Sequence, residues 1–130
     1  MKLLLDTHVF LWYITGDQHL PIHISDAIRD LRNDVYLSVV SIWEATVKYQ
    51  LGKLPLPQSP DIYLPFQREQ HQIASLALDE NSVSKLVTLP ALHRDPFDRM
   101  LICQSLAHDL VFVTADEVIH AYSVPLLKAG

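Results

Sequence analysis

Several cysteines, long hydrophobic runs and an excess of positive charge are all missing from this sequence of 130 residues. The single cysteine, Cys103, excludes an internal disulfide and a zinc site made of several thiolates, and it is compatible with a reducing cytosol. The apolar stretch Val9–Ile14 is too short to span a bilayer, and Lys2 is followed by only three leucines before Asp6, which is not the pattern of a signal peptide. We therefore expect a cytoplasmic protein without a membrane segment.

The charge balance argues against a protein that binds nucleic acid through a basic surface. The chain has 15 acidic and 10 basic residues and a formal net charge of −5, whereas phosphate backbones are normally met by basic surfaces. If four of the acids bind divalent cations, 11 acids remain against 10 bases, and the objection weakens. Hydrophobic residues make up 49% and charged residues 19%, which is typical of a folded chain, and the length indicates one domain over residues 1–130.

Short apolar runs alternate with helical patterns along the chain, which is typical of parallel strands joined by helices. We expect strands at residues 3–5, 35–39, 72–78 and 110–114, with an edge strand within 121–127. Helices are expected at residues 9–16, 25–32, 41–51, 60–70, 81–86 and 96–107. The pattern predicts an α/β fold around a parallel sheet of four or five strands.

Two aspartates follow the clearest of these strands. Asp6 comes directly after the apolar run 3–5, and Asp116 comes two residues after the run 110–114. In open α/β sheets the carboxyl ends of the strands form the edge at which ligands bind. Helix capping is an equally good explanation for Asp116 when that residue is taken alone.

Glu44 has two competing interpretations. Ser41 and Glu44 have the spacing of a capping box at the start of the helix 41–51, which is a complete structural explanation. A glutamate in the first turn of a helix that follows a parallel strand also faces the carboxyl edge of the sheet. The second interpretation makes Glu44 a candidate site residue.

The segment before the last predicted helix contributes further acids. Asp95 is a suitable N-cap and Pro96 a suitable first helical residue, so Asp98 lies in the first turn, where the helix dipole favours a carboxylate. Capping is the preferred explanation for Asp95, and less so for Asp98. His93 and Arg94 either contact phosphate or are solvated loop residues, and the sequence does not separate these alternatives.

The candidate site is a set of acids that lie far apart in the sequence and are expected at one edge of the sheet. Its members are Asp6, Glu44, Asp98 and Asp116. Crowded carboxylates raise one another's pKa unless a cation neutralises them, and hard oxygen ligands suit Mg²⁺ or Mn²⁺. Such a site suits phosphodiester hydrolysis by a metal-activated water. The neighbouring hydroxyls of Thr7, Ser41 and Thr114 are expected to orient carboxylates or water.

Four blocks of the sequence together resemble the PIN-domain ribonucleases, and among them the VapC-type toxins of bacterial toxin–antitoxin pairs. The blocks are residues 3–8 (LLLDTH), 41–44 (SIWE) running into 51–54 (LGKL), 93–99 (HRDPFDR) and 113–116 (VTAD). Any one block alone is weak evidence. Their order and spacing over nearly the whole chain are specific.

The resemblance implies a three-layer α/β/α fold, Mg²⁺-dependent cleavage of RNA that leaves a 5′-phosphate and a 3′-hydroxyl, and a homodimer. It also implies inhibition by a cognate antitoxin whose tail fills the groove and masks the acids. The acidic quartet of the family falls on Asp6, Glu44, Asp98 and Asp116. Asp6 and Asp98 are expected to be the main metal ligands and Asp116 a further one, with Asp95 and Arg99 in support.

Three other functions compete with this one. Seven histidines make a metal-independent ribonuclease conceivable, but no spacing in the sequence pairs them. A non-catalytic protein would keep the fold and bind partners or RNA without cutting, which the complete acidic set disfavours. A phosphatase with an aspartyl-phosphate intermediate also begins with a strand that ends in Asp, but it needs a second Asp where this chain has His8.

Overall fold

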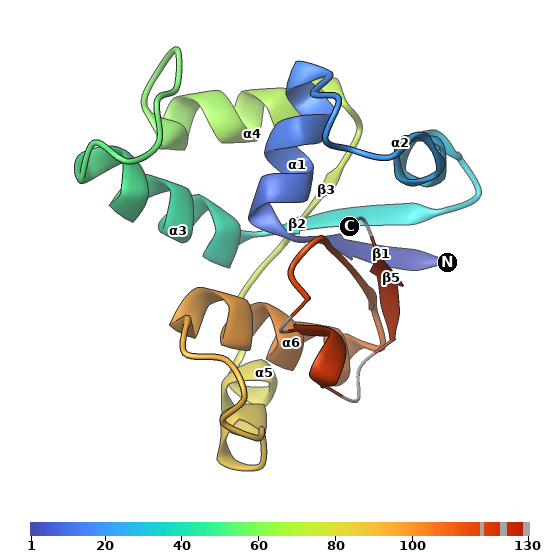
Figure 1. Ribbon diagram of the computed structural model, residues 1–130, viewed down its shortest axis with the longest axis vertical. Coiled ribbons are helices and arrows are strands. Elements are labelled where there is room, and N and C mark those ends of the chain that lie inside the picture. Colours follow the sequence, from blue (N-terminus) through green and yellow to red (C-terminus); the bar gives the residue numbers. More distant parts are fainter. Residues whose placement is uncertain (118, 123–124, 129–130) are drawn as a thin grey trace.

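Five parallel strands form the sheet of the computed structural model, which describes residues 1–117, 119–122 and 125–128 (Figure 1). The strands are β1 (Lys2–Leu5), β2 (Asp34–Ser38), β3 (Ala74–Leu76), β4 (Val111–Thr114) and β5 (Leu126–Lys128). Their order across the sheet is β3-β2-β1-β4-β5, and each neighbouring pair is parallel. The predicted α/β fold around a parallel sheet is confirmed.

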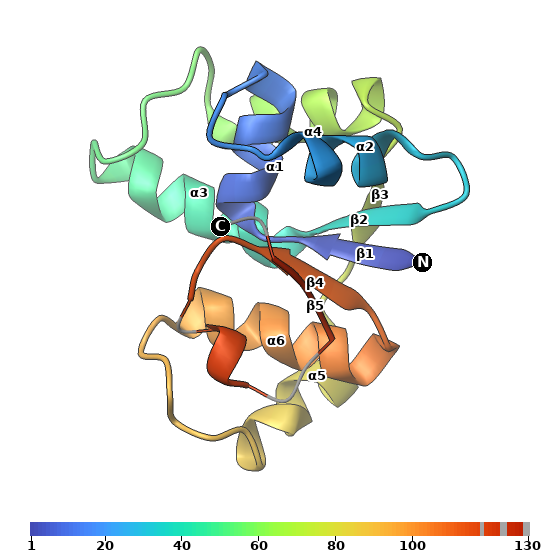
Figure 2. The ribbon, with the colours of Figure 1, turned by 45° about the vertical axis from the view of Figure 1, so that its right-hand side comes forward.

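Helices cover both faces of this sheet, so the three-layer α/β/α arrangement is also confirmed (Figure 2). The helices are α1 (Thr7–Thr15), α2 (Ile22–Arg29), α3 (Val39–Gln50), α4 (Pro60–Gln70), α5 (Glu80–Ser84) and α6 (Pro96–His108), with 3₁₀ turns η1 (Lys85–Val87) and η2 (Ile119–Ala121). Figure 2 shows α1, α2 and α4 on one side of the strands and α5 and α6 on the other. No described helix is long and apolar enough to cross a membrane.

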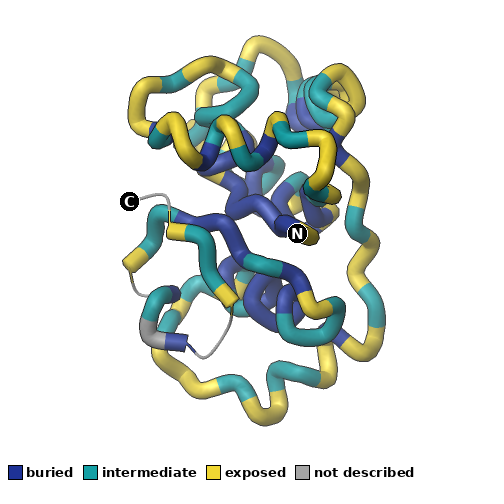
Figure 3. The backbone as a smooth tube through the Cα atoms, turned by 90° about the vertical axis from the view of Figure 1, so that its right-hand side faces the viewer, coloured by how far each residue is buried: buried dark blue, intermediate teal, exposed yellow. Residues whose placement is uncertain are grey.

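The leucines of β1 explain why the sheet needs two covering layers. Leu3 and Leu5 pack into a core cluster that includes Ile24 of α2, whereas Leu4 packs into a second cluster that includes Leu101 of α6. Successive strand residues point to opposite faces, and all three leucines are 0% exposed. Figure 3 shows the resulting buried centre, with the exposed residues on the outer helices and loops.

Helix α3 begins earlier than expected, and this changes the interpretation of its serines. The hydroxyl of Ser38 accepts the backbone N–H of Val40 at 3.0 Å, so Ser38 is the N-cap and α3 begins at Val39. Ser41 therefore lies inside the helix, and the capping-box interpretation of Ser41 and Glu44 is wrong. The capping-box alternative to a functional role for Glu44 is thereby removed.

Helix α2 is shifted toward the N-terminus relative to the prediction. Pro21 occupies the N-cap position with a φ of −59°, so the helix starts before Ser25. It ends before Asp30, because the carboxylate of Asp30 accepts the backbone N–H of Arg32 at 3.0 Å and its guanidinium N–H at 2.8 Å. Leu31, expected on the apolar face, is 90% exposed.

Two strands are shorter than their predicted ranges. β3 does not extend back to Gln72, because that residue has a φ of +57°, which is incompatible with an extended strand. The edge strand expected within 121–127 is β5, which begins only at Leu126 and ends at Lys128, one residue beyond that range. The part of the range at residues 123–124 lies outside the described residues. Pro125 precedes β5, and its carbonyl accepts the N–H of Phe112 at 2.8 Å.

The carboxyl ends of the central strands meet at one edge of the sheet. Leu5 pairs with Val113, so the residues after β1 lie beside those after β4. On the other side of β1, β2 runs from Ser38 directly into α3. Parallel pairing therefore brings side chains from distant parts of the sequence to this edge.

Candidate active site

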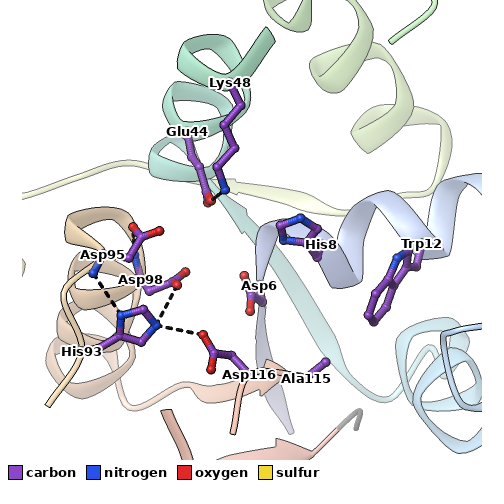
Figure 4. Close-up of a pocket in the computed structure, with 10 residues that line it drawn as sticks. All are labelled: Asp6, His8, Trp12, Glu44, Lys48, His93, Asp95, Asp98, Ala115 and Asp116. Carbon is purple, nitrogen blue, oxygen red and sulfur yellow. Dashed lines mark hydrogen bonds and ion pairs between the residues drawn. The ribbon is translucent and has the colours of Figure 1, made fainter. Parts of the chain in front are cut away.

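A cavity of about 370 Å³ opens at the carboxyl edge of the sheet (Figure 4). It is lined by Asp6, His8, Trp12, Glu44, Lys48, His93, Asp95, Asp98, Ala115 and Asp116. All four acids of the predicted set line this cavity, together with Asp95. We call it the acidic pocket.

Asp6 is the acid nearest the centre of the sheet. Its backbone N–H donates to the carbonyl of Val113 at 2.9 Å, which places the residue at the boundary between β1 and α1. Its side chain is nearly buried, and Oδ2 accepts the hydroxyl proton of Thr114 at 2.7 Å. Burial raises the pKa of Asp6 above its ordinary value, although the Thr114 hydrogen bond and the nearby His8 act in the opposite direction.

Glu44 is 2% exposed and is held on both carboxylate oxygens. The hydroxyl of Thr7 donates to Oε1 at 2.7 Å, and Nζ of Lys48 donates to Oε2. The Thr7 and Ser41 hydroxyl oxygens are 2.8 Å apart, and because the single proton of Thr7 is used on Glu44, Ser41 supplies the proton between them. The predicted supporting hydroxyls therefore lie beside the acids, as Thr114 does beside Asp6.

Asp98 lies in the first turn of α6, as its spacing from Pro96 predicts. The carboxylate of Asp95 accepts the backbone N–H groups of Phe97 at 2.8 Å and of Asp98 at 3.3 Å, so the capping role of Asp95 is confirmed. Burial, followed by the charge of Asp6 and of three further acids, raises the pKa of Asp98 to about 8. Without a cation, this carboxyl group holds a proton at neutral pH.

His93 belongs to the acidic pocket, although the sequence did not distinguish it from a loop residue. Its Nε2 lies 2.8 Å from Oδ2 of Asp116 and 3.1 Å from Oδ2 of Asp98 (Figure 4). The adjacent Arg94 is exposed. The sequence contains no signal for these contacts, because they join a loop to residues in two other segments.

Lys48 is a pocket residue that the sequence analysis missed. It lies one helical turn after Glu44, and this i, i+4 spacing is a signal that the sequence does contain. Burial alone would lower the pKa of Lys48, but the carboxylate of Glu44 and the charges of two further acids raise it above its ordinary value. The pocket thus contains a fixed positive charge as well as its acids.

Arg99 supports the pocket only indirectly. Its guanidinium donates to the carbonyl of Pro90 at 3.1 Å and to the carbonyl of His93 at 3.5 Å. These hydrogen bonds hold the loop that carries His93. They do not join Arg99 to a carboxylate.

The donor atoms fit a hard divalent cation. Two sets of three residues each offer donor atoms that lie within 4.8 Å of one another. One set is Glu44, Asp95 and Asp98, and the other is His93, Asp98 and Asp116. Asp98 is common to both sets, and its pKa is raised by burial and then by the charges of the neighbouring carboxylates. Asp6 lines the same pocket but belongs to neither set among the described residues. Oxygen-rich donors of this kind suit Mg²⁺ or Mn²⁺.

Comparison with known proteins finds similarity in both sequence and fold. A segment of 52 residues is 36% identical to Ribonuclease VapC16 of Mycobacterium tuberculosis, and it covers 40% of this chain and 37% of that protein. The fold is similar to a chain of VapBC2 from Rickettsia felis bound to a promoter DNA fragment, with a TM-score of 0.72, 12% identity and full coverage of both chains. It is also similar to a chain of DNA-bound VapBC from Salmonella typhimurium, with a TM-score of 0.64, 18% identity and coverage of 100% of this chain and 99% of that one.

A match to a family model covers most of the chain. Residues 3–124 match the PIN domain, a range that includes every lining residue of the acidic pocket. The resemblance to VapC-type proteins of this class is confirmed by the same comparisons. The chain belongs to the PIN domain family.

Proposed function

We propose that this protein is an endoribonuclease that depends on a divalent metal ion, with Mg²⁺ as the preferred cation and Mn²⁺ as an alternative. The observation that carries the proposal is the convergence of Asp6, Glu44, Asp98 and Asp116 in one pocket at the carboxyl edge of the sheet. The match to the PIN domain and the similarity to a named ribonuclease support it.

The acids have distinct roles in this proposal. Asp6, Asp98 and Asp116 would hold the cation, which supplies an activated water and shields the charge that develops on the phosphate. Glu44 is fixed by Thr7 and Lys48, so its carboxylate is oriented toward the pocket before RNA binds. We expect the cut RNA to carry a 5′-phosphate and a 3′-hydroxyl.

The cleavage assay is RNA incubated with the purified full chain in Mg²⁺, with and without EDTA, followed by analysis of the ends. We expect cleavage that EDTA abolishes. A metal-independent histidine ribonuclease is the rival mechanism, because His8 and His93 both line the pocket. Cleavage that persists in EDTA and leaves a 2′,3′-cyclic phosphate would favour a metal-independent histidine ribonuclease and contradict this proposal.

We further propose that the protein is the toxin of a cytoplasmic toxin–antitoxin pair and acts as a homodimer. Its structural relatives include chains from several VapBC complexes, which supports a cognate antitoxin. A second cavity of about 300 Å³ adjoins the acidic pocket, because His8 and Trp12 line both. The rest of its wall is largely apolar and comes from α1, the loop 54–57 and Tyr63, which suits an apolar segment of an antitoxin.

Expression in a bacterial host tests the toxin role separately from the nuclease role. We expect the wild-type chain expressed alone to arrest growth and the Asp98→Asn variant at the same protein level not to do so. Unaffected growth with the wild-type chain would contradict the toxin role while leaving the nuclease activity to the cleavage assay.

A further inference from the structure

His93 is held in place by contacts with three other residues. Its backbone N–H donates to the hydroxyl of Tyr122 at 2.8 Å, and its carbonyl accepts the guanidinium N–H of Arg99 at 3.5 Å. Its ring nitrogen Nδ1 accepts the backbone N–H of Asp95 at 3.0 Å. With the side chain only 13% exposed, these contacts fix both the backbone and the orientation of the ring.

The hydrogen bond from Asp95 assigns the tautomer of this ring. A backbone N–H can only donate, so Nδ1 must present its lone pair, and the single proton of the neutral imidazole lies on Nε2. Nε2–H then donates to Oδ2 of Asp116 at 2.8 Å. A nitrogen that carries a proton has no lone pair with which to bind a metal ion.

The set His93, Asp98 and Asp116 is therefore not equivalent to three metal ligands, although its donor atoms are close enough together. For His93 to bind a metal through Nε2, its proton would have to move to Nδ1, where it would face the N–H of Asp95. Two donors would then oppose each other in a nearly buried position. The geometry favours two carboxylate ligands and one N–H donor.

We propose that His93 is a positioning residue that orients the carboxylate of Asp116 beside that of Asp98 and does not itself bind the metal ion. This inference rests on the proposed metal-dependent function. Asp116 follows β4 and its side chain is 33% exposed, whereas the side chain of Asp98 is 12% exposed. His93 thus links the more exposed acid to the buried one.

The assignment determines the chemistry of the metal that the pocket selects. With His93 outside the coordination sphere, the protein ligands are all oxygens, which suits Mg²⁺ and Mn²⁺. An imidazole ligand would shift the preference toward Zn²⁺, Co²⁺ or Ni²⁺. The positioning role and the ligand role therefore predict different metal preferences for the same residues.

Pulsed electron paramagnetic resonance of the full chain loaded with Mn²⁺ tests the assignment without RNA. We expect bound Mn²⁺ with no hyperfine coupling from a directly coordinated nitrogen. Nitrogen coupling of the strength found for an imidazole ligand would overturn the inference while leaving the metal-dependent function intact. If the wild-type chain bound no Mn²⁺, the proposed function and this inference would both be overturned.

Two variants and a control add a second measurement by calorimetric titration with Mg²⁺ and Mn²⁺. In His93→Gln the side-chain amide can still donate near the position of Nε2, so we expect affinities within a few-fold of wild type. In His93→Ala the donor is lost, and the affinity should fall by about tenfold or more, as removal of a residue that orients a metal ligand typically causes. His23→Ala, which removes an exposed histidine of α2, is the matched control and should not change the affinity.

Thermal unfolding of each variant must show a folded chain before the affinities are compared. Equal losses in His93→Gln and His93→Ala would mean that the imidazole itself is required, which contradicts a role that an amide donor can fill. Wild-type affinity in both variants would overturn the positioning role as well. Only the graded series of wild type, Gln and Ala supports it.

Discussion

Thr114 donates its hydroxyl proton to Oδ2 of Asp6 at 2.7 Å, although the two residues are 108 positions apart in the sequence. The hydrogen bond joins the ends of two neighbouring strands, β4 and β1, at the edge where the acidic pocket opens. It also favours the ionised form of a carboxyl group whose pKa is raised by burial. The Thr114 hydroxyl thus lowers the pKa of an acid to which we assign the role of a metal ligand.

Thr114→Val tests this relationship, because valine has nearly the shape of threonine but no hydroxyl. The variant leaves Asp6 without its donor and the backbone N–H of Asp116 without its acceptor at 3.0 Å. We expect Mg²⁺ affinity to fall by about tenfold and the free energy of unfolding to fall by about 1–3 kcal/mol. Calorimetric titration and urea unfolding measure the two effects. Thr114→Ser is the control, because it keeps the hydroxyl and should retain both the Mg²⁺ affinity and the stability of wild type.

Asp98→Asn should abolish RNA cleavage without unfolding the protein. The amide keeps the size of the side chain and is always neutral, whereas the raised pKa means that the wild-type chain must bind a proton at Asp98 when it folds at neutral pH without a cation. We expect the melting temperature at neutral pH, measured in EDTA, to be unchanged or higher than that of wild type. A variant that melts well below wild type would show that Asp98 is a structural acid.

The raised pKa of Asp98 predicts a pH dependence of stability for the metal-free protein. The pKa is about 8 in the folded state and 3.8 in the reference state, so between these values the folded chain binds more protons than the unfolded one. Stability must then fall as pH rises, by up to about 1.4 kcal/mol per pH unit for one proton. Urea unfolding in EDTA should show that the free energy of unfolding of wild type falls by about 1 kcal/mol relative to that of Asp98→Asn between about pH 6 and pH 7. A constant difference would contradict the assignment.

Lys48→Met should destabilise the protein because it leaves the carboxylate of Glu44 buried without its cation. The side chain of Glu44 is 3% exposed and that of Lys48 is 32% exposed, so we expect a loss of about 1–2 kcal/mol, below the value for a fully buried pair. In a double-mutant cycle with Glu44→Gln, the double variant should lose less free energy of unfolding than the sum of the losses in the two single variants. Additive losses would show that the two residues do not interact.

Most acids of the acidic pocket could be predicted from the sequence because they lie at strand ends and helix N-termini that the sequence marks clearly. The run Leu3–Leu5 marks a strand buried on both faces, which places Asp6 at its carboxyl end. Asp95 and Pro96 mark the start of a helix, which places Asp98 in its first turn. Each of these signals lies within a few residues of the acid that it positions.

The sequence-based predictions failed where a contact distant in the sequence decides between two local structures that are both compatible with the sequence. Ser38 and Ser41 are both suitable N-caps for α3. Ser38 is fixed in that role partly by its hydrogen bond to Oε1 of Gln104 at 2.5 Å, a residue of α6 that is 66 positions away. The placement of His93 depends in the same way on Asp116, which is 23 positions away in another segment. Local patterns cannot contain such information.

The location of a bound cation tests the central claim most directly. Crystals of the wild-type protein soaked in Mn²⁺ and measured near the manganese absorption edge would give an anomalous difference map. We predict a peak in the acidic pocket, within bonding distance of carboxylate oxygens of Asp6, Asp98 and Asp116. A map in which Mn²⁺ binds elsewhere while the pocket shows no peak would contradict the account.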